Sequence, residues 1–312
     1  MSGNSIFSKA DLAVVKRAYA KQIAFIGGVE HPALEEAFAT TPRERFVGEG
    51  PWQVFGWSGY RTTPTADPVY LYSDVLIGLV PERGLNNGQP SGHAKWMAAA
   101  GPRPGERVVH IGAGVGYYSA ILAHLMGPSG RVTAVECDPA LASRATANLS
   151  AFPSVDVLQG DGTSVNFEPA DVIYVNAGAT RPMDVWLDRL NNGGRLVLPL
   201  TTNRRSGAPP LSPQGGMFRF ERRGAEFSAA WISPAAFIPG EGMRDEDSEA
   251  ALAAAFAKGG WQDVASLHRT DGIADERCWV HAPGWSLVRA VKPAGDVLST
   301  GKTPIASPTP PL

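Results

Sequence analysis

Three glycines spaced two residues apart follow an apolar run near the middle of the chain. The run covers residues 107–111, and the glycines are Gly112, Gly114 and Gly116. Glycine permits a tight turn and lets backbone N–H groups come close to a ligand, so a glycine turn between a strand and a helix is suited to bind a nucleotide. The alternative is a tight turn that uses glycine for structural reasons alone.

The spacing of these glycines distinguishes between nucleotide cofactors. Dinucleotide-binding proteins have the pattern G-x-G-x-x-G. Here the third glycine comes one residue earlier, and Tyr117 stands where that pattern has glycine or alanine. The shorter pattern resembles the first motif of class I methyltransferases, which bind S-adenosyl-L-methionine. His110 stands where that motif has its first acidic residue.

Acidic residues follow the glycine loop at the ends of the next two predicted strands. Glu136 comes about 20 residues after the loop, where a nucleotide-binding fold places the carboxylate that accepts the ribose hydroxyls. Asp161, between Gly160 and Gly162, could accept from an adenine amino group. A solvent-facing glutamate and an ordinary Asp-Gly turn are the alternatives. Because the carboxyl ends of parallel strands meet at one edge of a sheet, the three features together predict a cofactor site.

These features require a parallel sheet to bring them together. Strands are predicted to alternate with helices, the strands over 107–111, 131–135, 155–159, 171–175 and 195–200 and the helices over 117–126, 139–151 and 183–190. This alternation predicts an α/β fold with a Rossmann-like, doubly wound, mostly parallel sheet. Residues 217–223 and 226–232 predict a C-terminal antiparallel hairpin.

The other segments divide the chain into four predicted parts. These are an N-terminal helical and irregular cap over 1–72, a cofactor-binding core over 73–240, an α/β extension over 241–292 and a disordered tail over 293–312. Further predicted elements are helices over 8–25, 31–39, 91–100 and 248–258, strands near 264–267 and 278–280, irregular structure over 48–71, a turn at 191–194 and a loop over 203–216.

Composition and charge restrict the class of protein. Lys and Arg total 28 against 30 Asp and Glu, for a net charge of -2, so there is no overall positive charge to bind nucleic acid and we expect no such partner. Two isolated cysteines predict neither a disulfide framework nor a metal site. No signal peptide is visible, and no apolar run approaches the roughly 20 residues of a membrane helix. We therefore expect a cytoplasmic protein that does not bind membranes.

Further motifs resemble those of the protein-L-isoaspartate O-methyltransferases from about residue 15 to residue 239. They are Pro42-Arg43-Glu44-Arg45-Phe46-Val47, Gln89-Pro90 with His93-Ala94, the glycine loop, Gly160-Asp161-Gly162, residues 192–199 and Ala236-Phe237-Ile238-Pro239. The resemblance implies a class I methyltransferase fold, S-adenosyl-L-methionine as the cofactor, and a carboxylate of a protein or peptide as the methyl acceptor.

The loop before Pro90 departs from the family pattern. The family's loop reads T-I-S-[QA]-P, and its serine is held responsible for activity, whereas residues 86–90 here read N-N-G-Q-P. The resemblance therefore places Gly88 at the serine position, and implies a catalytic set of Gly88, Gln89 and His93. The alternative for His93 is a helix histidine that bonds to a neighbour. Loss of the serine predicts weak methylation of ordinary isoaspartyl peptides.

Three asparagines complete the expected cofactor site. Asn86 and Asn87 could instead orient a substrate carboxylate or amide together with Gln89, or simply form a turn. Asn176 ends the fourth predicted strand, in the sequence Val175-Asn176-Ala177-Gly178. That sequence differs from the (D/N/S)-P-P-(Y/F) pattern of enzymes that methylate amino groups of nucleic acids, which disfavours such a substrate.

The chemistry of the acceptor agrees with a carboxylate. A carboxyl group has a pKa of about 4, so it is already anionic at neutral pH and needs no general base to attack a methyl group. Loss of a serine hydroxyl therefore need not abolish the reaction. A methyltransferase for a small molecule or another peptide group, and a cofactor-binding module without catalysis, remain alternatives, the last because of Gly88.

Overall fold

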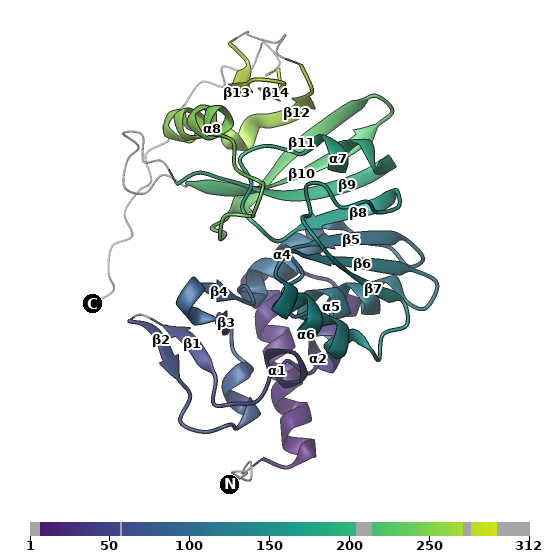
Figure 1. Ribbon diagram of the computed structural model, residues 1–312, viewed down its shortest axis with the longest axis vertical. Coiled ribbons are helices and arrows are strands. Elements are labelled where there is room, and N and C mark those ends of the chain that lie inside the picture. Colours follow the sequence, from purple (N-terminus) through teal and green to yellow (C-terminus); the bar gives the residue numbers. More distant parts are fainter. Residues whose placement is uncertain (1–6, 57, 204–213, 271–275, 292–312) are drawn as a thin grey trace, which may run out of the picture.

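The computed structural model describes residues 7–56, 58–203, 214–270 and 276–291. Its centre is a ten-stranded sheet in the order β13-β14-β12-β11-β10-β9-β8-β5-β6-β7 (Figure 1). Strands β9, β8, β5, β6 and β7 pair in parallel, and every pairing from β9 outward to β13 is antiparallel. The strands are β5 (Arg107–Ile111), β6 (Arg131–Glu136), β7 (Val155–Gln159), β8 (Ala170–Val175), β9 (Leu190–Thr201), β10 (Gly215–Arg223), β11 (Glu226–Pro234), β12 (Val264–His268), β13 (Cys278–Ala282) and β14 (Trp285–Arg289).

The predicted fold class is confirmed, with a larger antiparallel part than expected. The predicted hairpin is β10 and β11, and β12, β13 and β14 extend it. Strand β14 is not among the predicted elements, and it pairs with both β12 and β13. The predicted tail over 293–312, and most of the predicted loop over 203–216, lie outside the described residues.

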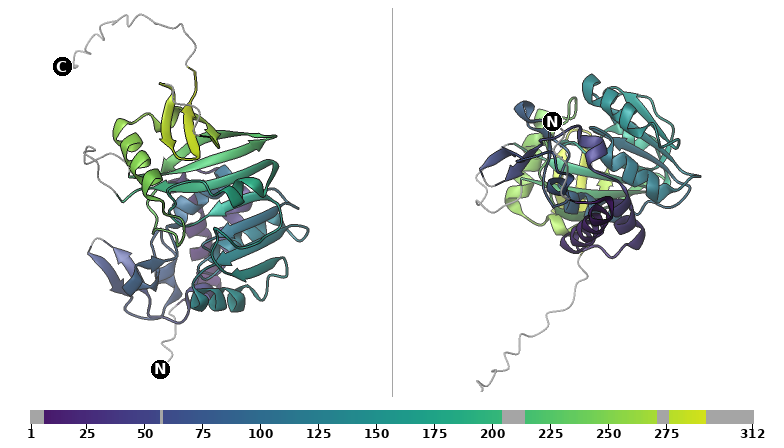
Figure 2. Two further views of the ribbon diagram at one scale, coloured as in Figure 1. Left: turned by 45° about the horizontal axis from the view of Figure 1, so that its top comes forward. Right: turned by 90° about the horizontal axis from the view of Figure 1, so that it is seen from below.

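Helices cover both faces of the sheet (Figures 1 and 2). Along β5 the burial alternates, because Val108 belongs to one apolar cluster while Val109 and Ile111 belong to the other. The first cluster includes residues of α4, α5 and α6, and the second includes residues of α7 and α8. The helices are α1 (Lys9–Gly27), α2 (Pro32–Thr40), α3 (Glu44–Val47), α4 (Pro90–Ala100), α5 (Tyr117–Met126), α6 (Pro139–Leu149), α7 (Asp184–Asp188) and α8 (Glu246–Lys258), with 3₁₀ turns η1 (Pro68–Leu71), η2 (Pro81–Arg83) and η3 (Trp261–Asp263).

The prediction of irregular structure over residues 48–71 is wrong. This segment contains a hairpin of β1 (Gln53–Gly56) and β2 (Gly59–Thr62), followed by η1. The hairpin is anchored by pairing that is distant in sequence, since Val54 forms a bridge with Ile77. Beside it lies a second pair of short strands, β3 (Gly78–Val80) and β4 (Leu85–Asn86). Strands of two to four residues show no periodicity of their own, so only the tertiary pairing defines them.

The predicted turn at residues 191–194 lies inside β9. Ala170 pairs with Leu190 and Val172 pairs with Arg195, so the four residues of β9 between these pairs oppose only Asp171. Gly193 has a φ of +76° in this segment, a backbone conformation that glycine adopts without strain. The glycines therefore form a bulge in a continuous strand.

Two features of the described residues bear on function. None of their helices has the length and the apolar composition that crossing a membrane requires. They also contain no group of three or more His, Cys, Asp or Glu side chains suited to hold a metal ion.

A buried arginine connects the end of α4 to the sheet. The two terminal nitrogens of Arg195 each donate to the Glu106 carboxylate at 2.8 Å, and its Nε donates to the Ala100 carbonyl at 3.0 Å. The Arg195 side chain is 4% exposed. Its charge is thus satisfied by partners from the α4–β5 connection, which fixes α4 against β9.

Arg195→Met should lower the free energy of unfolding by about 3 kcal/mol, because it leaves a half-buried carboxylate and a buried carbonyl without their donor. Urea unfolding followed by circular dichroism measures this change. The matched control is Arg223→Met, since the Arg223 side chain is 68% exposed, and its effect should stay within about 0.5 kcal/mol. Equal unfolding midpoints for the two variants would contradict the proposed anchoring.

Two histidines are fully buried, His93 of α4 and His110 of β5. His110 Nδ1 is 2.8 Å from the Ser119 hydroxyl, and His93 Nδ1 is 2.8 Å from the Tyr174 hydroxyl. Burial lowers the pKa of His110 to about 3. Burial, followed by the charges of His110 and Arg43, lowers the pKa of His93 well below its usual range. Both imidazoles are therefore neutral at pH 7.

The pH dependence of stability follows from these lowered pKa values. Below the ordinary histidine pKa of 6.5, the unfolded chain takes up protons that the folded chain does not bind, so stability is full above that pH and falls as the pH decreases. Each histidine contributes a slope of up to about 1.4 kcal/mol per pH unit. His110→Asn keeps a hydrogen-bonding partner for Ser119 and should reduce the slope of the free energy of unfolding between pH 6 and 4.5 by about this amount. Identical slopes for the two proteins would refute a neutral, buried His110.

Candidate functional site

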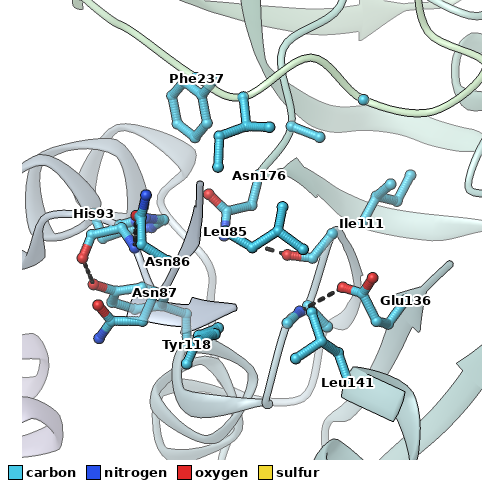
Figure 3. A pocket seen from close by; sticks show the side chains of 18 of the residues that line it. Leu85, Asn86, Asn87, His93, Ile111, Tyr118, Glu136, Leu141, Asn176 and Phe237 are labelled. Carbon is cyan, nitrogen blue, oxygen red and sulfur yellow. Dashed lines mark hydrogen bonds between the residues drawn. The ribbon is translucent and has the colours of Figure 1, made fainter. Parts of the chain in front are cut away.

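A cavity of about 550 Å³ opens at the carboxyl ends of the parallel strands. Three parts of the chain form its walls: the ends of β5, β6 and β8, the segment from β4 into α4, and the segment that follows β11. Figure 3 shows Asn86, Asn87 and His93 on one side of this cavity and Ile111 and Glu136 on the other. The volume lies within the range of pockets that enclose small ligands.

The glycine loop connects β5 to α5 and forms part of the cavity wall. Gly112, Gly114 and Gly116 have φ values of +76°, +58° and +88°, which residues other than glycine rarely adopt. A Cβ on Gly112 would lie 3.0 Å from the Asn176 carbonyl, and one on Gly116 would lie 2.6 Å from Leu149. On Gly114 the nearest atom would be a Leu79 methyl at 3.5 Å. Packing thus requires the outer glycines, whereas Gly114 is constrained by its backbone conformation.

Glu136 joins the glycine loop to the end of β6. Its side chain is buried, and the Gly114 N–H donates to Oε2 at 2.7 Å while the Asp138 N–H donates to Oε1 at 3.0 Å. Each carboxylate oxygen has more than one acceptor site, so both keep capacity for a ligand. Glu136 also lines the cavity. A carboxylate in this position could accept from the two vicinal hydroxyls of a ribose.

Asp161 differs from the other predicted cofactor residues in its position. Gly160 and Gly162 line the cavity, but Asp161 is not among the lining residues. Its carboxylate accepts from the Thr163 N–H at 2.8 Å and from the Thr163 hydroxyl at 2.7 Å. This is the local Asp-Gly turn that the sequence offered as the alternative, so binding of adenine by Asp161 stays a prediction.

The three predicted asparagines all line the cavity, and each bonds to the backbone. Asn86 accepts from the Gly88 N–H at 2.9 Å, and Asn176 donates to the Gly112 carbonyl at 3.3 Å. Asn87 is 5% exposed and accepts from the Ile77 N–H at 2.8 Å. Its Nδ2 is buried and has no hydrogen-bond partner in the described part of the chain. That amide is therefore a free donor in the wall of the cavity.

The imidazole of His93 occupies the space beside Gly88. A Cβ on Gly88 would lie 2.2 Å from His93 Nε2, and Gly88 has a φ of +73°. The His93 ring stacks on Tyr118 with 3.6 Å between centroids, and the Tyr118 hydroxyl donates to the Gly88 carbonyl at 3.1 Å. Gly88 stands at the position that carries serine in related loops. While His93 keeps this orientation, a side chain at Gly88 would collide with the imidazole, and the positive φ would also disfavour any residue but glycine.

The side chain of Gln89 is held by Asp74. Gln89 Nε2 donates to the Asp74 carboxylate at 2.8 Å, and both the N–H and the hydroxyl of Ser91 donate to it at 2.9 and 2.6 Å. Asp74 lies in the segment 71–75, where Arg43 donates to the carbonyls of Leu71, Ser73 and Val75. Arg43 belongs to the motif at residues 42–47, so that motif positions the loop from within the core.

Several lining residues were not predicted from the sequence. Trp96 of α4 donates to the Ser233 hydroxyl at 2.9 Å and packs on Phe237 with 5.1 Å between ring centroids. Together they connect α4 to the segment 235–240, which also lines the cavity. The sequence resemblance includes residues 236–239 but does not assign them to the site, and no local sequence pattern connects Trp96 to them.

Comparisons with known proteins agree with this geometry. The sequence model of the family described as protein-L-isoaspartate(D-aspartate) O-methyltransferase matches residues 16–239. A protein named protein-L-isoaspartate O-methyltransferase from Methanopyrus kandleri is 33% identical over 202 residues, which are 63% of this chain and 79% of the relative. A protein of the same name from Methylorubrum populi is 32% identical over 218 residues, 68% of this chain and 88% of the relative.

Solved structures lead to the same family. One named protein-L-isoaspartate O-methyltransferase has a TM-score of 0.57 and 25% identity, covering 71% of this chain and 65% of that chain. A Plasmodium falciparum structure, described as a putative protein-L-isoaspartate O-methyltransferase in complex with S-adenosyl-L-homocysteine, shares the fold at a TM-score of 0.56 and 15% identity, covering 72% of this chain and 97% of that chain. Because the family model matches more than half of the sequence, the chain belongs to the protein-L-isoaspartate O-methyltransferase family of class I methyltransferases.

Proposed function

We propose that this chain transfers a methyl group from S-adenosyl-L-methionine to a carboxylate of a protein or peptide. The observation that carries the proposal is the pairing of a positive-φ glycine loop with the buried Glu136 at the ends of β5 and β6. When bound, S-adenosyl-L-methionine supplies an electrophilic methyl group on a sulfonium. Glu136 would accept from the ribose, Asn87 would donate through its free Nδ2, and Gly160 and Gly162 would leave room for the adenine.

The acceptor would enter from the opposite end of the cavity. In the sheet, β5 separates β6, which carries Glu136, from β8, which carries Asn176 at its end. The segment 235–240 lies over the end of β8, because the Gly178 N–H donates to the Ile238 carbonyl at 2.8 Å. In Figure 3, Phe237 is accordingly on the far side of Asn176 from Glu136. We assign the end beneath Phe237 and Trp96 to the acceptor.

A carboxylate acceptor suits the groups at this end. His93 Nδ1 is engaged with Tyr174, and its Nε2 is buried against Gly88, so the ring is not positioned to take a proton from an acceptor. A carboxylate has no proton to lose at neutral pH, and its reaction depends on orientation instead. His93 would then act as a positioning residue that holds the loop of Gly88. A small-molecule carboxylate is the second candidate, since the cavity is open to either. Location in the cytoplasm and the lack of a nucleic-acid partner stay predictions.

Glu136→Ala should weaken binding of S-adenosyl-L-homocysteine by about 1.5–3 kcal/mol, the contribution of hydrogen bonds to a charged acceptor. Isothermal titration calorimetry measures the change. Glu136→Gln keeps the size of the side chain and one acceptor oxygen, so its loss should be smaller. Failure of the wild-type protein to bind at millimolar ligand would exclude the proposed cofactor site.

Methylation of isoaspartyl peptides should be at least about tenfold weaker than that of an authentic repair enzyme assayed alongside, because Gly88 brings no hydroxyl to the acceptor. Gly88→Ser alone should not restore it, since the new Cβ meets His93 and the left-handed backbone costs about 1–2 kcal/mol. Adding His93→Ala opens the space. The double variant Gly88→Ser/His93→Ala should then methylate isoaspartyl peptide faster than Gly88→Ala/His93→Ala, from which it differs only by the hydroxyl. Equal rates would show that the hydroxyl is irrelevant here.

A further inference from the structure

The charged groups of the cavity are separated between its two ends. Its charged lining residues are Glu136, Asp138, Glu241, Arg83 and Lys95. Arg83 pairs with Asp138 at 2.5 Å. Glu241 lies at this same end, because it directly precedes Gly242, where a Cβ would lie 3.1 Å from the Asp161 carboxylate at the end of β7. The cofactor end therefore holds three carboxylates and one arginine that is already paired.

Lys95 is the lining cation that is left without a counter-ion. No described residue forms an ion pair or hydrogen bond with its ammonium group. It follows Gly92 by three positions on α4 and directly precedes Trp96, and all three line the cavity. Trp96 belongs to the acceptor end through its contacts with Ser233 and Phe237. On the other side of α4, Gly27 of α1 packs against the backbone of Ser91 and Lys95.

We infer that Lys95 binds the carboxylate of the acceptor and gives the site its preference for an acidic peptide. An anionic acceptor that approaches this cavity meets a net negative set of side chains, and Lys95 is the unpaired cation among the lining residues that offsets that repulsion. The ammonium group stands on a flexible four-carbon stem and can follow the carboxylate into the cavity. Phe237, half-buried beside Trp96, provides an apolar wall for the neighbouring side chain. This inference rests on the proposed function, since it names the acceptor of that same site.

The test measures binding, so it does not depend on turnover. Dye-labelled hexapeptides with phenylalanine beside one aspartyl or isoaspartyl residue are titrated into the full chain with saturating S-adenosyl-L-homocysteine, and fluorescence anisotropy is recorded. The same peptides with asparagine or isoasparagine give the neutral reference. At least one acidic peptide should bind the wild type about fivefold more tightly than its neutral counterpart, the upper end for an ion pair that is open to solvent. This preference should decrease as the salt concentration rises.

Variants then assign the preference to one side chain. Lys95→Gln should abolish it, Lys95→Glu should reverse it, and Lys95→Arg should retain it. Lys21→Gln, which removes an exposed lysine of α1 outside the cavity, should leave it unchanged. An acid preference that persists in Lys95→Gln, or that is absent from the wild type, overturns the inference. Titration of S-adenosyl-L-homocysteine into each protein separates the two proposals. If the wild type does not bind this ligand, the proposed function is wrong. If the Lys95 variants bind it as tightly as the wild type does, Lys95 acts on the acceptor alone.

Discussion

The guanidinium of Arg43 imposes the constraint on which the site depends. It is fully buried, and a buried charge costs several kcal/mol unless hydrogen bonds compensate it. The compensation comes from three carbonyls of residues 71–75 and from the faces of Tyr19 and Tyr117, whose centroids lie 5.6 and 5.7 Å away. A segment without regular structure is thereby held in one conformation. Asp74 in this segment then determines where Gln89 and the first turn of α4 lie.

Two walls of different origin enclose the cavity. The sheet supplies one wall through the ends of β5, β6 and β8, where parallel strands collect loop residues that are far apart in sequence. The segment from β4 into α4 supplies the other, and hydrogen bonds to Ile77 and Asp74 hold it from behind. The apolar contact of Trp96 with Phe237 closes the gap between these walls.

The absence of a side chain at Gly88 is coupled to the orientation of His93, whose ring occupies that space. With glycine at this position the backbone adopts a φ of +73°, and the His93 ring comes to within 2.2 Å of where a Cβ would stand. The ring is neutral, and it is stabilised by two contacts of different kinds, the stacking on Tyr118 and the hydrogen bond with Tyr174. Placing a serine at position 88 would therefore also require the side chain of His93 to move or to be replaced. At Gly88 the loop therefore presents its backbone and no hydroxyl to the cavity.

The sequence by itself determined the parts of this protein that depend on local chemistry. Apolar runs predicted β5, α5 and β7 to the residue. Strand β5 is buried from Val108 to Ile111, whereas β7, at the edge of the sheet, is only partly buried. The glycine spacing and Glu136 predicted that the ends of β5 and β6 line one site, since each feature directly follows or ends its strand. Tertiary structure decided what depends on distant pairing: the β1–β2 hairpin, the bulge in β9, the position of Asp161 outside the cavity wall, and the contact of His93 with Gly88. Lys95 and Trp96 belong to the second group, because a helix sequence does not show which of its residues meet a segment that is over a hundred residues away.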